Sequence, residues 1–395
     1  MYRYVDSASL NGSWKFVKNT WGHSLHRMCS RTGSFPPALA RYFIEKFSKK
    51  GDRVLDPFSG KGTAPLEACL SERIGIGNDL APEAYVLTYA KVRPVSFKTA
   101  KRYLDEIKHK MDIVNVDLSE APEDVAVFYH PETLKQIIAL KELIQDDDSD
   151  EAIFTKALMC GILHGSSEIS LSLPCSHSFS MSPKYVKRYA KLHKLKRPRR
   201  DVIRCLIRKA QRVLKDGVPK IRGEAYRNDA SQLELEDESV DLIVTSPPYF
   251  DKQTYAWDNW LRLWFLGYNY RDINRMLFNS QSKSKFIKFI TKCIKEMYRV
   301  LKEDSACFIV IGDVKLNGER INTAELIADI AIAVGFDVKR IINDTIPRNA
   351  KYFMFIPKGK GIRLDRIVEL HKGRVDERDV ILPWNGGSED SNHTL

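Results

Sequence analysis

The sequence lacks the signals of a membrane, secreted or zinc-binding protein. No segment approaches the roughly 18 consecutive apolar residues that a membrane-spanning helix needs. The segment Met1–Asp6 contains no secretory apolar stretch. The seven cysteines are scattered, odd in number and without a CxxC pair, which argues against a disulfide framework and against a zinc site. We therefore expect a cytoplasmic globular protein with reduced thiols, no membrane partner and no metal.

A proline-stiffened turn is the most informative feature that is present. The apolar run 241–245 opens with an acid and predicts a buried strand, and the two prolines after it must end that strand. The hydroxyl of Ser246 and a backbone carbonyl fixed by Pro247 and Pro248 could accept hydrogen bonds from the amine of a planar ring, and Tyr249 could stack on that ring. We predict that Ser246, Pro247, Pro248 and Tyr249 are the catalytic residues.

A second pattern predicts a strand, a glycine loop and a helix within residues 53–70. Gly60 and Gly62 allow the backbone to approach a ligand closely, and Asp56 at the strand end could accept from an ammonium group. A phosphate-binding P-loop is excluded because its spacing and its Lys-Ser/Thr ending are missing, and because an acid at this place would repel phosphate.

These segments resemble the DNA amino methyltransferases, which transfer a methyl group from S-adenosylmethionine to the exocyclic nitrogen of cytosine or adenine. Residues 245–249 resemble the catalytic motif of that family, 53–63 its cofactor loop, and 34–44 the turn and helix that close over the methionine end of the cofactor. Asp79 lies 23 positions after Asp56 and takes the ribose-binding role by analogy with doubly wound folds.

The resemblance also makes Asp229 the acceptor for the adenine amine, with a solvated turn aspartate as its alternative interpretation. S-adenosylmethionine is thus the expected cofactor. Its contacts are predicted at Phe35, Pro36, Asp56, Pro57, Phe58, Gly60, Gly62, Thr63, Asp79, Leu80, Asp229 and Ala230.

Positive charge is concentrated in one segment. Residues 184–215 hold fourteen Lys and Arg against one acid, whereas the whole chain carries a net charge of +12. Such a patch is either a solvated helix face or a footprint of phosphate-backbone binding, and the neighbouring methyltransferase pattern favours the second. We predict DNA contacts at Lys184, Lys187, Arg188, Lys191, Lys194, Lys196, Arg197, Arg199, Arg200 and Arg204.

The predicted fold class is α/β, a Rossmann-like doubly wound sheet with an inserted, mostly helical module for DNA recognition. Residues 1–96 and 223–372 are expected to form the catalytic domain, 97–222 the helical insertion that clamps DNA, and 373–395 a C-terminal tail. The cofactor loop precedes the catalytic turn with a large insertion between them, an order that resembles the alpha-type arrangement of the family.

The expected activity is site-specific methylation of double-stranded DNA at the N4 amine of a flipped cytosine, with a cognate restriction endonuclease as possible partner. Serine at position 246 is typical of family members that act on cytosine. The alternatives are N6-adenine methylation, an RNA substrate, and a nucleic-acid-binding protein with a degenerate methyltransferase fold. Cys175 follows a proline, as in the carbon-five cytosine methyltransferases, but serine-rich sequence precedes it where that chemistry needs a strand.

Overall fold

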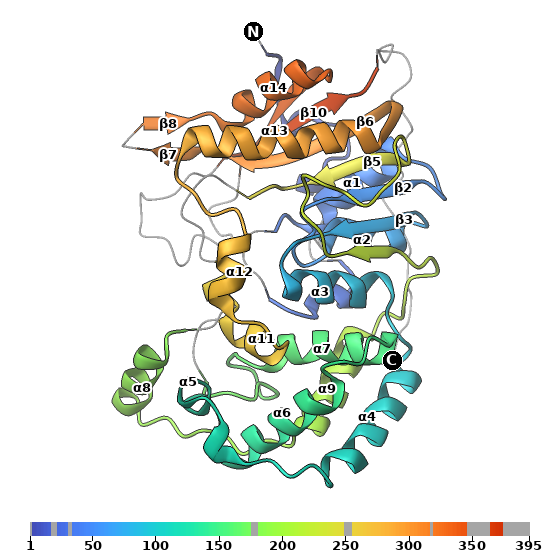
Figure 1. Ribbon diagram of the computed structural model, residues 1–395. Helices are drawn as coiled ribbons and strands as arrows, with labels where there is room; N and C mark the ends of the chain where they lie inside the picture. Colours follow the sequence, from blue (N-terminus) through green and yellow to red (C-terminus); the bar gives the residue numbers. More distant parts are fainter. Residues whose placement is uncertain are drawn as a thin grey trace.

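The computed structural model describes residues 2–16, 22–30, 34–174, 181–248, 255–316, 319–345 and 364–373. Its centre is an eight-stranded sheet (Figure 1). Across the sheet the strands run in the order β1 (Tyr4–Asp6), β9 (Asp337–Thr345), β10 (Leu364–His371), β6 (Leu301–Gly312), β5 (Val240–Thr245), β2 (Arg53–Asp56), β3 (Ile74–Asn78) and β4 (Glu224–Tyr226).

The strand order confirms the predicted doubly wound α/β fold. From β2 the chain adds β3 and β4 on one side, and then returns to add β5 and β6 on the other. All neighbouring strands pair in parallel except β10, which runs antiparallel to both β6 and β9. In such sheets the reversal of order, here between β2 and β5, opens a crevice at the carboxyl ends of the strands where ligands bind.

Alternate side chains of the central strands supply two separate cores. Ile243 and Ile309 belong to a cluster with helices α13 (Lys283–Val300) and α14 (Thr323–Val334). Leu242 and Val310 belong to a cluster on the opposite face with α1 (Pro37–Phe47). Successive residues of a strand point to opposite faces, so a run that is apolar throughout predicts burial on both sides. The sheet is therefore the middle layer of three.

The remaining elements join these layers and extend them. Helices α2 (Thr63–Leu70) and α3 (Pro82–Val92) flank β3 in sequence. Residues 97–213 hold α4 (Phe97–Met111), α5 (Glu123–Ala126), α6 (Pro131–Ile144), α7 (Asp150–Ile162), α8 (Pro183–Leu192) and α9 (Val202–Val213). After β5 come α10 (Tyr255–Asp258), α11 (Trp260–Phe265), α12 (Tyr270–Met276) and a hairpin of β7 (Val314–Leu316) and β8 (Glu319–Ile321).

The helices of residues 97–213 share one core with the sheet-bearing part of the chain. Leu87 and Ala90 of α3 lie in the same buried cluster as Leu158 of α7 and Leu206 of α9. Trp260 and its neighbours Leu261 and Phe265 on α11 also belong to it. Figure 1 shows this helical layer below the sheet, with α3 and α11 next to it.

One segment differs from its sequence-based expectation. The serine-rich composition of residues 165–183 predicts a mobile surface loop, but residues 169–173 of this stretch are buried. Leu171 and Leu173 are buried, and their amides donate to the carbonyls of Ile162 and Phe128. Serine composition predicted exposure, but the alternating leucines determine the burial.

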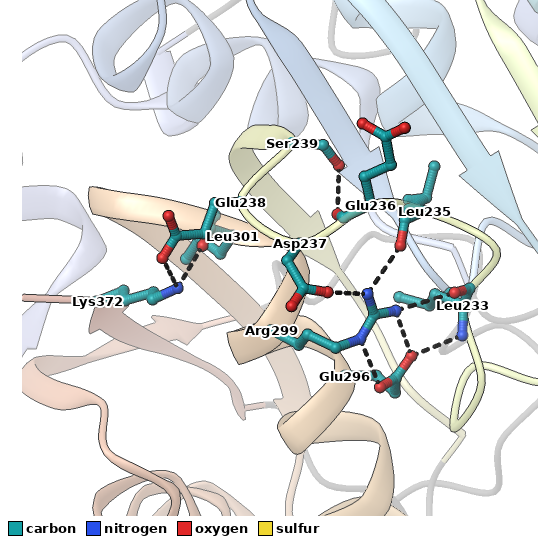
Figure 2. Close-up of polar contacts among 10 residues, drawn as sticks. All are labelled: Leu233, Leu235, Glu236, Asp237, Glu238, Ser239, Glu296, Arg299, Leu301 and Lys372. Atoms are coloured by element: carbon teal, nitrogen blue, oxygen red, sulfur yellow. Dashed lines mark hydrogen bonds and ion pairs between the residues drawn. The ribbon is translucent and has the colours of Figure 1, made fainter.

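A guanidinium fixes the loop that leads into β5. Arg299, on the last turn of α13, donates to the carbonyls of Leu233 and Leu235 and to the carboxylate of Asp237. Glu296 pairs with Arg299 and accepts from the Leu233 amide (Figure 2). Because Asp229 and Ala230 lie in the same loop between β4 and β5, these bonds position both residues and the start of β5.

Candidate active site

A cavity of about 250 Å³ lies at the switch point of the sheet, where three strand-end loops converge. The loop after β2 contributes Pro57, Phe58 and Gly60, and the loop after β3 contributes Asp79, Leu80 and Ala81. The loop after β4 contributes Asn228, Asp229 and Ala230, and the turn after β5 contributes Ser246 and Pro248. The fold thus brings together residues from all four sequence patterns.

A buried hydrogen bond joins the cofactor loop to the catalytic turn. The Thr245 hydroxyl donates to Asp56 Oδ1 over 2.6 Å, and the Phe58 amide donates to the same oxygen over 3.1 Å. Asp56 is 2% exposed and Thr245 is fully buried. Burial raises the pKa of Asp56 to about 7, Asp79 adds to this rise, and the two hydrogen bonds oppose it. The carboxyl group is therefore sensitive to any cation that binds beside it.

Asp79 is held by backbone amides on both sides. Its Oδ2 accepts from Gly60 over 2.8 Å and its Oδ1 from Ala81 over 2.9 Å. These two bonds orient the carboxylate at the cavity wall, where its remaining lone pairs can accept from hydroxyl groups.

Asn78 is a positioning residue that sequence reasoning missed. Its side-chain amide donates to the carbonyls of Pro57 and Asn228, and its oxygen accepts from the Asn228 amide. The residue is 2% exposed, so it links the loops without lining the cavity. The available signal was a polar residue within an otherwise apolar strand, directly before Asp79.

The apolar wall of the cavity comes from the segment after the catalytic turn. Phe289 lies 6.1 Å from Phe58 and 4.6 Å from Phe278 between ring centroids, the latter pair stacked at 14°. These rings offer a surface for a flat heterocycle. Sequence reasoning assigned none of these lining residues to the site: Ala81, Asn228, Met276, Leu277, Phe278 and Phe289.

Several predicted cofactor residues do not line this cavity, and the buried Asp56 is one of them. Phe35 packs against the core around α1, and Pro36 forms the N-cap of that helix. Gly62 has φ +70°, and a side chain there would meet the backbone of Thr88 at 2.9 Å, so close packing against α3 requires glycine. Thr63 is buried at the start of α2, and its hydroxyl has no hydrogen-bond partner among the described residues.

The catalytic turn is described only in part. Ser246 and Pro248 line the cavity, whereas Pro247 is buried behind them. Tyr249 and Cys175 lie outside the described residues.

The two histidines before α1 have structural partners. The ring of His23 contacts the Asp216 carbonyl at 3.1 Å. His26 Nε2 lies 2.6 Å from Glu67, which also pairs with Arg41 at 3.0 Å. Burial lowers the pKa of His26 to about 4, so the ring is neutral at pH 7. Neither histidine lines the cavity.

The basic segment is not uniformly available for a partner. Arg208 and Arg212 on α9 both pair with Glu168, and Arg199 lies 3.9 Å from Glu132. Lys209 donates to the Arg27 carbonyl. Of the other predicted DNA contacts, Arg204 is exposed on α9, and the rest are mostly exposed on α8 and on the loop between α8 and α9.

The fold and the cavity define a doubly wound α/β protein with a cavity at the switch point of its sheet. The family model described as DNA methylase matches residues 3–90 and 240–370, together more than half of the chain. The chain belongs to this family of DNA methylases. The family supports the prediction of S-adenosylmethionine as cofactor.

Two curated relatives are named Type II methyltransferases. M.MvaI of Kocuria varians is 24% identical over 273 residues, which are 63% of this chain and 58% of the relative. M.MjaII of Methanocaldococcus jannaschii is 30% identical over 87 residues, 22% of this chain and 16% of the relative. The chain thus matches little more than half the length of the first relative and a smaller part of the second.

Two solved methyltransferase structures match most of this chain with low TM-scores. An S-adenosylmethionine-dependent methyltransferase from Methanosarcina mazei is 12% identical with a TM-score of 0.34, covering 84% of this chain and 96% of that one. An rRNA methyltransferase from Streptomyces viridochromogenes is 11% identical with a TM-score of 0.31, covering 88% and 90%. Both TM-scores are below 0.5.

Proposed function

We propose that this chain methylates the exocyclic N4 amine of a cytosine flipped out of double-stranded DNA, with S-adenosylmethionine as methyl donor, within a restriction-modification system. The observation that carries the proposal is the convergence of Ser246 and Pro248 with Asp79 and Asp229 around one cavity. The names of the curated relatives support the restriction-modification role.

The residues around the cavity suit the parts of the proposed cofactor. The stacked rings of Phe278 and Phe289 provide an apolar face for its adenine, and the exposed carboxylate of Asp229 an acceptor for the adenine amine. Asp79 would accept from the ribose hydroxyls at the cavity wall. Asp56 is buried directly before Pro57 of that wall, and its charge would attract the ammonium group. When bound, the cofactor supplies an electrophilic methyl group on a sulfonium.

The catalytic turn would make the base amine a better nucleophile. The lone pair of an exocyclic amine is delocalised into its ring, so acceptors that favour a tetrahedral nitrogen promote attack. Ser246 and the Pro247 carbonyl would accept from the amine and hold it in line with the methyl group. The target base must first leave the duplex, which costs a few kcal/mol of stacking and pairing.

The choice of cytosine over adenine rests on the serine at position 246, and N6-adenine is the competing substrate. The test is mass spectrometry of nucleosides from DNA incubated with the protein and labelled S-adenosylmethionine. We expect label in 4-methylcytosine and its loss in Ser246→Ala. Label in 6-methyladenine would keep the enzyme class and overturn the base, and label in RNA alone would overturn DNA as substrate.

A further inference from the structure

Helix α8 carries a positive face that no acidic side chain of the described residues neutralises. Lys184, Lys187, Arg188 and Lys191 are all exposed, and their spacing of three, one and three residues places them on one side of the helix. Among the residues that the structure describes, none of the four has an ion pair with an acid. On the opposite side, Val186 is buried in the helical core.

The cations of α9 differ from those of α8 in this respect. Arg208 and Arg212 are paired with Glu168, and Lys209 is bound to a backbone carbonyl. Of the two basic helices, α8 therefore presents the larger uncompensated charge to a polyanion.

A direct contact ties the start of α8 to the segment that follows the catalytic turn. The indole N–H of Trp260 donates to the carbonyl of Met181 over 3.3 Å, one residue before Ser182, the N-cap of α8. Trp260 begins α11, and the short helix α10 before it places Tyr255 in the cavity wall. Figure 1 shows α8 at the lower left of the molecule, on the same side as α11 and α12.

The inner flank of α8 is stiffened by stacked rings. Tyr185 and Tyr189 stack at 5.7 Å and 18°, and His193 lies 4.2 Å beyond Tyr189. Arg188 lies over Tyr185 at 5.9 Å, which restrains the guanidinium on the outer side. A restrained guanidinium loses less rotamer entropy when it forms a bidentate contact than a free lysine does.

The size of α8 matches a DNA groove. Ten residues of α-helix are about 15 Å long, and the major groove, about 12 Å wide, admits one α-helix. Arginine recognises guanine by two hydrogen bonds in this groove, whereas lysines at the groove edge contact phosphates.

We propose that α8 lies in the major groove and reads bases beside the target. Arg188 contacts a base edge, and Lys184, Lys187 and Lys191 bind phosphates. This inference rests on the proposed DNA methylation and adds the element that determines sequence specificity.

The test is methylation of a pool of DNA duplexes with randomised sequence, scored by sequencing, for the full-length protein and two variants. Arg188→Ala should lose roughly 5- to 150-fold discrimination at one or two positions while keeping activity on the remaining sequences. The triple variant Lys184→Gln, Lys187→Gln, Lys191→Gln should weaken binding to all sequences alike. Its slope of log affinity against log salt should fall by up to about three.

The matched control is Lys108→Gln with Lys110→Gln, which removes two exposed cations from α4 in the same helical layer. We expect it to retain the wild-type sequence preference and salt slope. The role of α8 would be overturned if Arg188→Ala kept the wild-type sequence preference. It would also be overturned if the control lost as much of the salt slope per substituted lysine as the α8 triple variant. A wild-type protein that labels no DNA sequence would overturn the proposed function itself.

Discussion

At the residue scale, the proposed chemistry depends on the protonation state of Asp56. Its pKa is raised to about 7, so near pH 6 the folded protein holds a proton that an ordinary aspartate has lost. A cofactor ammonium beside Asp56 would favour the ionised form. Cofactor affinity should therefore rise with pH up to about 7, by at most about tenfold per unit, and level off above it.

Asp56→Asn should weaken cofactor binding and remove this pH dependence. Calorimetric titration with S-adenosylmethionine between pH 5.5 and 8.5 measures both, and Glu106→Gln on the exposed face of α4 is the control. Equal pH dependence in Asp56→Asn and wild type would exclude Asp56 as the titrating group.

Lys91 gives a second prediction at the residue scale. It is fully buried on α3, donates to the Lys61 carbonyl, and has its pKa lowered well below the usual value by burial. Below pH 10.5, the ordinary pKa of lysine, the unfolded chain binds a proton at Lys91 more readily than the folded chain does. Falling pH therefore favours the unfolded state, and Lys91 destabilises the fold increasingly. Lys91→Met should raise the free energy of unfolding at pH 7 by on the order of 1 kcal/mol.

The gain should shrink as pH approaches 10, where the unfolded chain also loses its proton. Urea denaturation at pH 7 and pH 10 measures it, with the exposed Lys101→Met as control. If Lys91→Met is less stable than wild type at pH 7, the loss of the hydrogen bond to the Lys61 carbonyl costs more free energy than is gained by removing the buried amine.

At the scale of elements, the hydrogen bonds of Arg299 form a clamp that holds the loop 233–239 on α13. This clamp supports the cavity residues that precede the loop. Arg299→Ala removes the donors to Leu233, Leu235 and Asp237 and should cost about 1–3 kcal/mol of unfolding free energy. Asp229 and Ala230 lie in the same connection between β4 and β5 as residues 233–239. Cofactor affinity should therefore also fall.

Denaturation and cofactor titration report the two effects separately. Arg299→Lys should restore part of the stability, and Arg102→Ala on exposed α4 should change neither quantity. A destabilised Arg299→Ala protein with wild-type cofactor affinity would mean that the loop keeps its conformation without the clamp.

At the scale of the whole molecule, the shared core makes residues 97–222 a structural part of the catalytic region. Replacing them by a short linker would expose Leu87 and Ala90 of α3 and the buried side of α11. We expect the shortened chain to aggregate or to lack the near-ultraviolet circular dichroism of a packed core. A monomeric deletion variant that binds S-adenosylmethionine would contradict this.

The sequence by itself determined the strands, the glycine loop and the order of the site segments. Apolar runs such as 241–245 are readable because burial on both faces leaves few polar positions, and Pro247 and Pro248 end a strand in any context. The resemblance of these segments to the DNA amino methyltransferases, with the analogy to doubly wound folds for Asp79, assigned Ser246, Asp79 and Asp229 to one site before their positions were known.

Only the tertiary structure decided which long-range partners these residues meet. Three contacts join segments that are separated in the chain. They are the Thr245–Asp56 bond, the packing of Phe278 and Phe289 at the wall of the cavity, and the pairing of α9 with Glu168. Local patterns contain no information about such contacts, because the packing of separate elements sets them. The basic segment shows this most clearly: sequence located the charge, and packing determined which cations stay exposed.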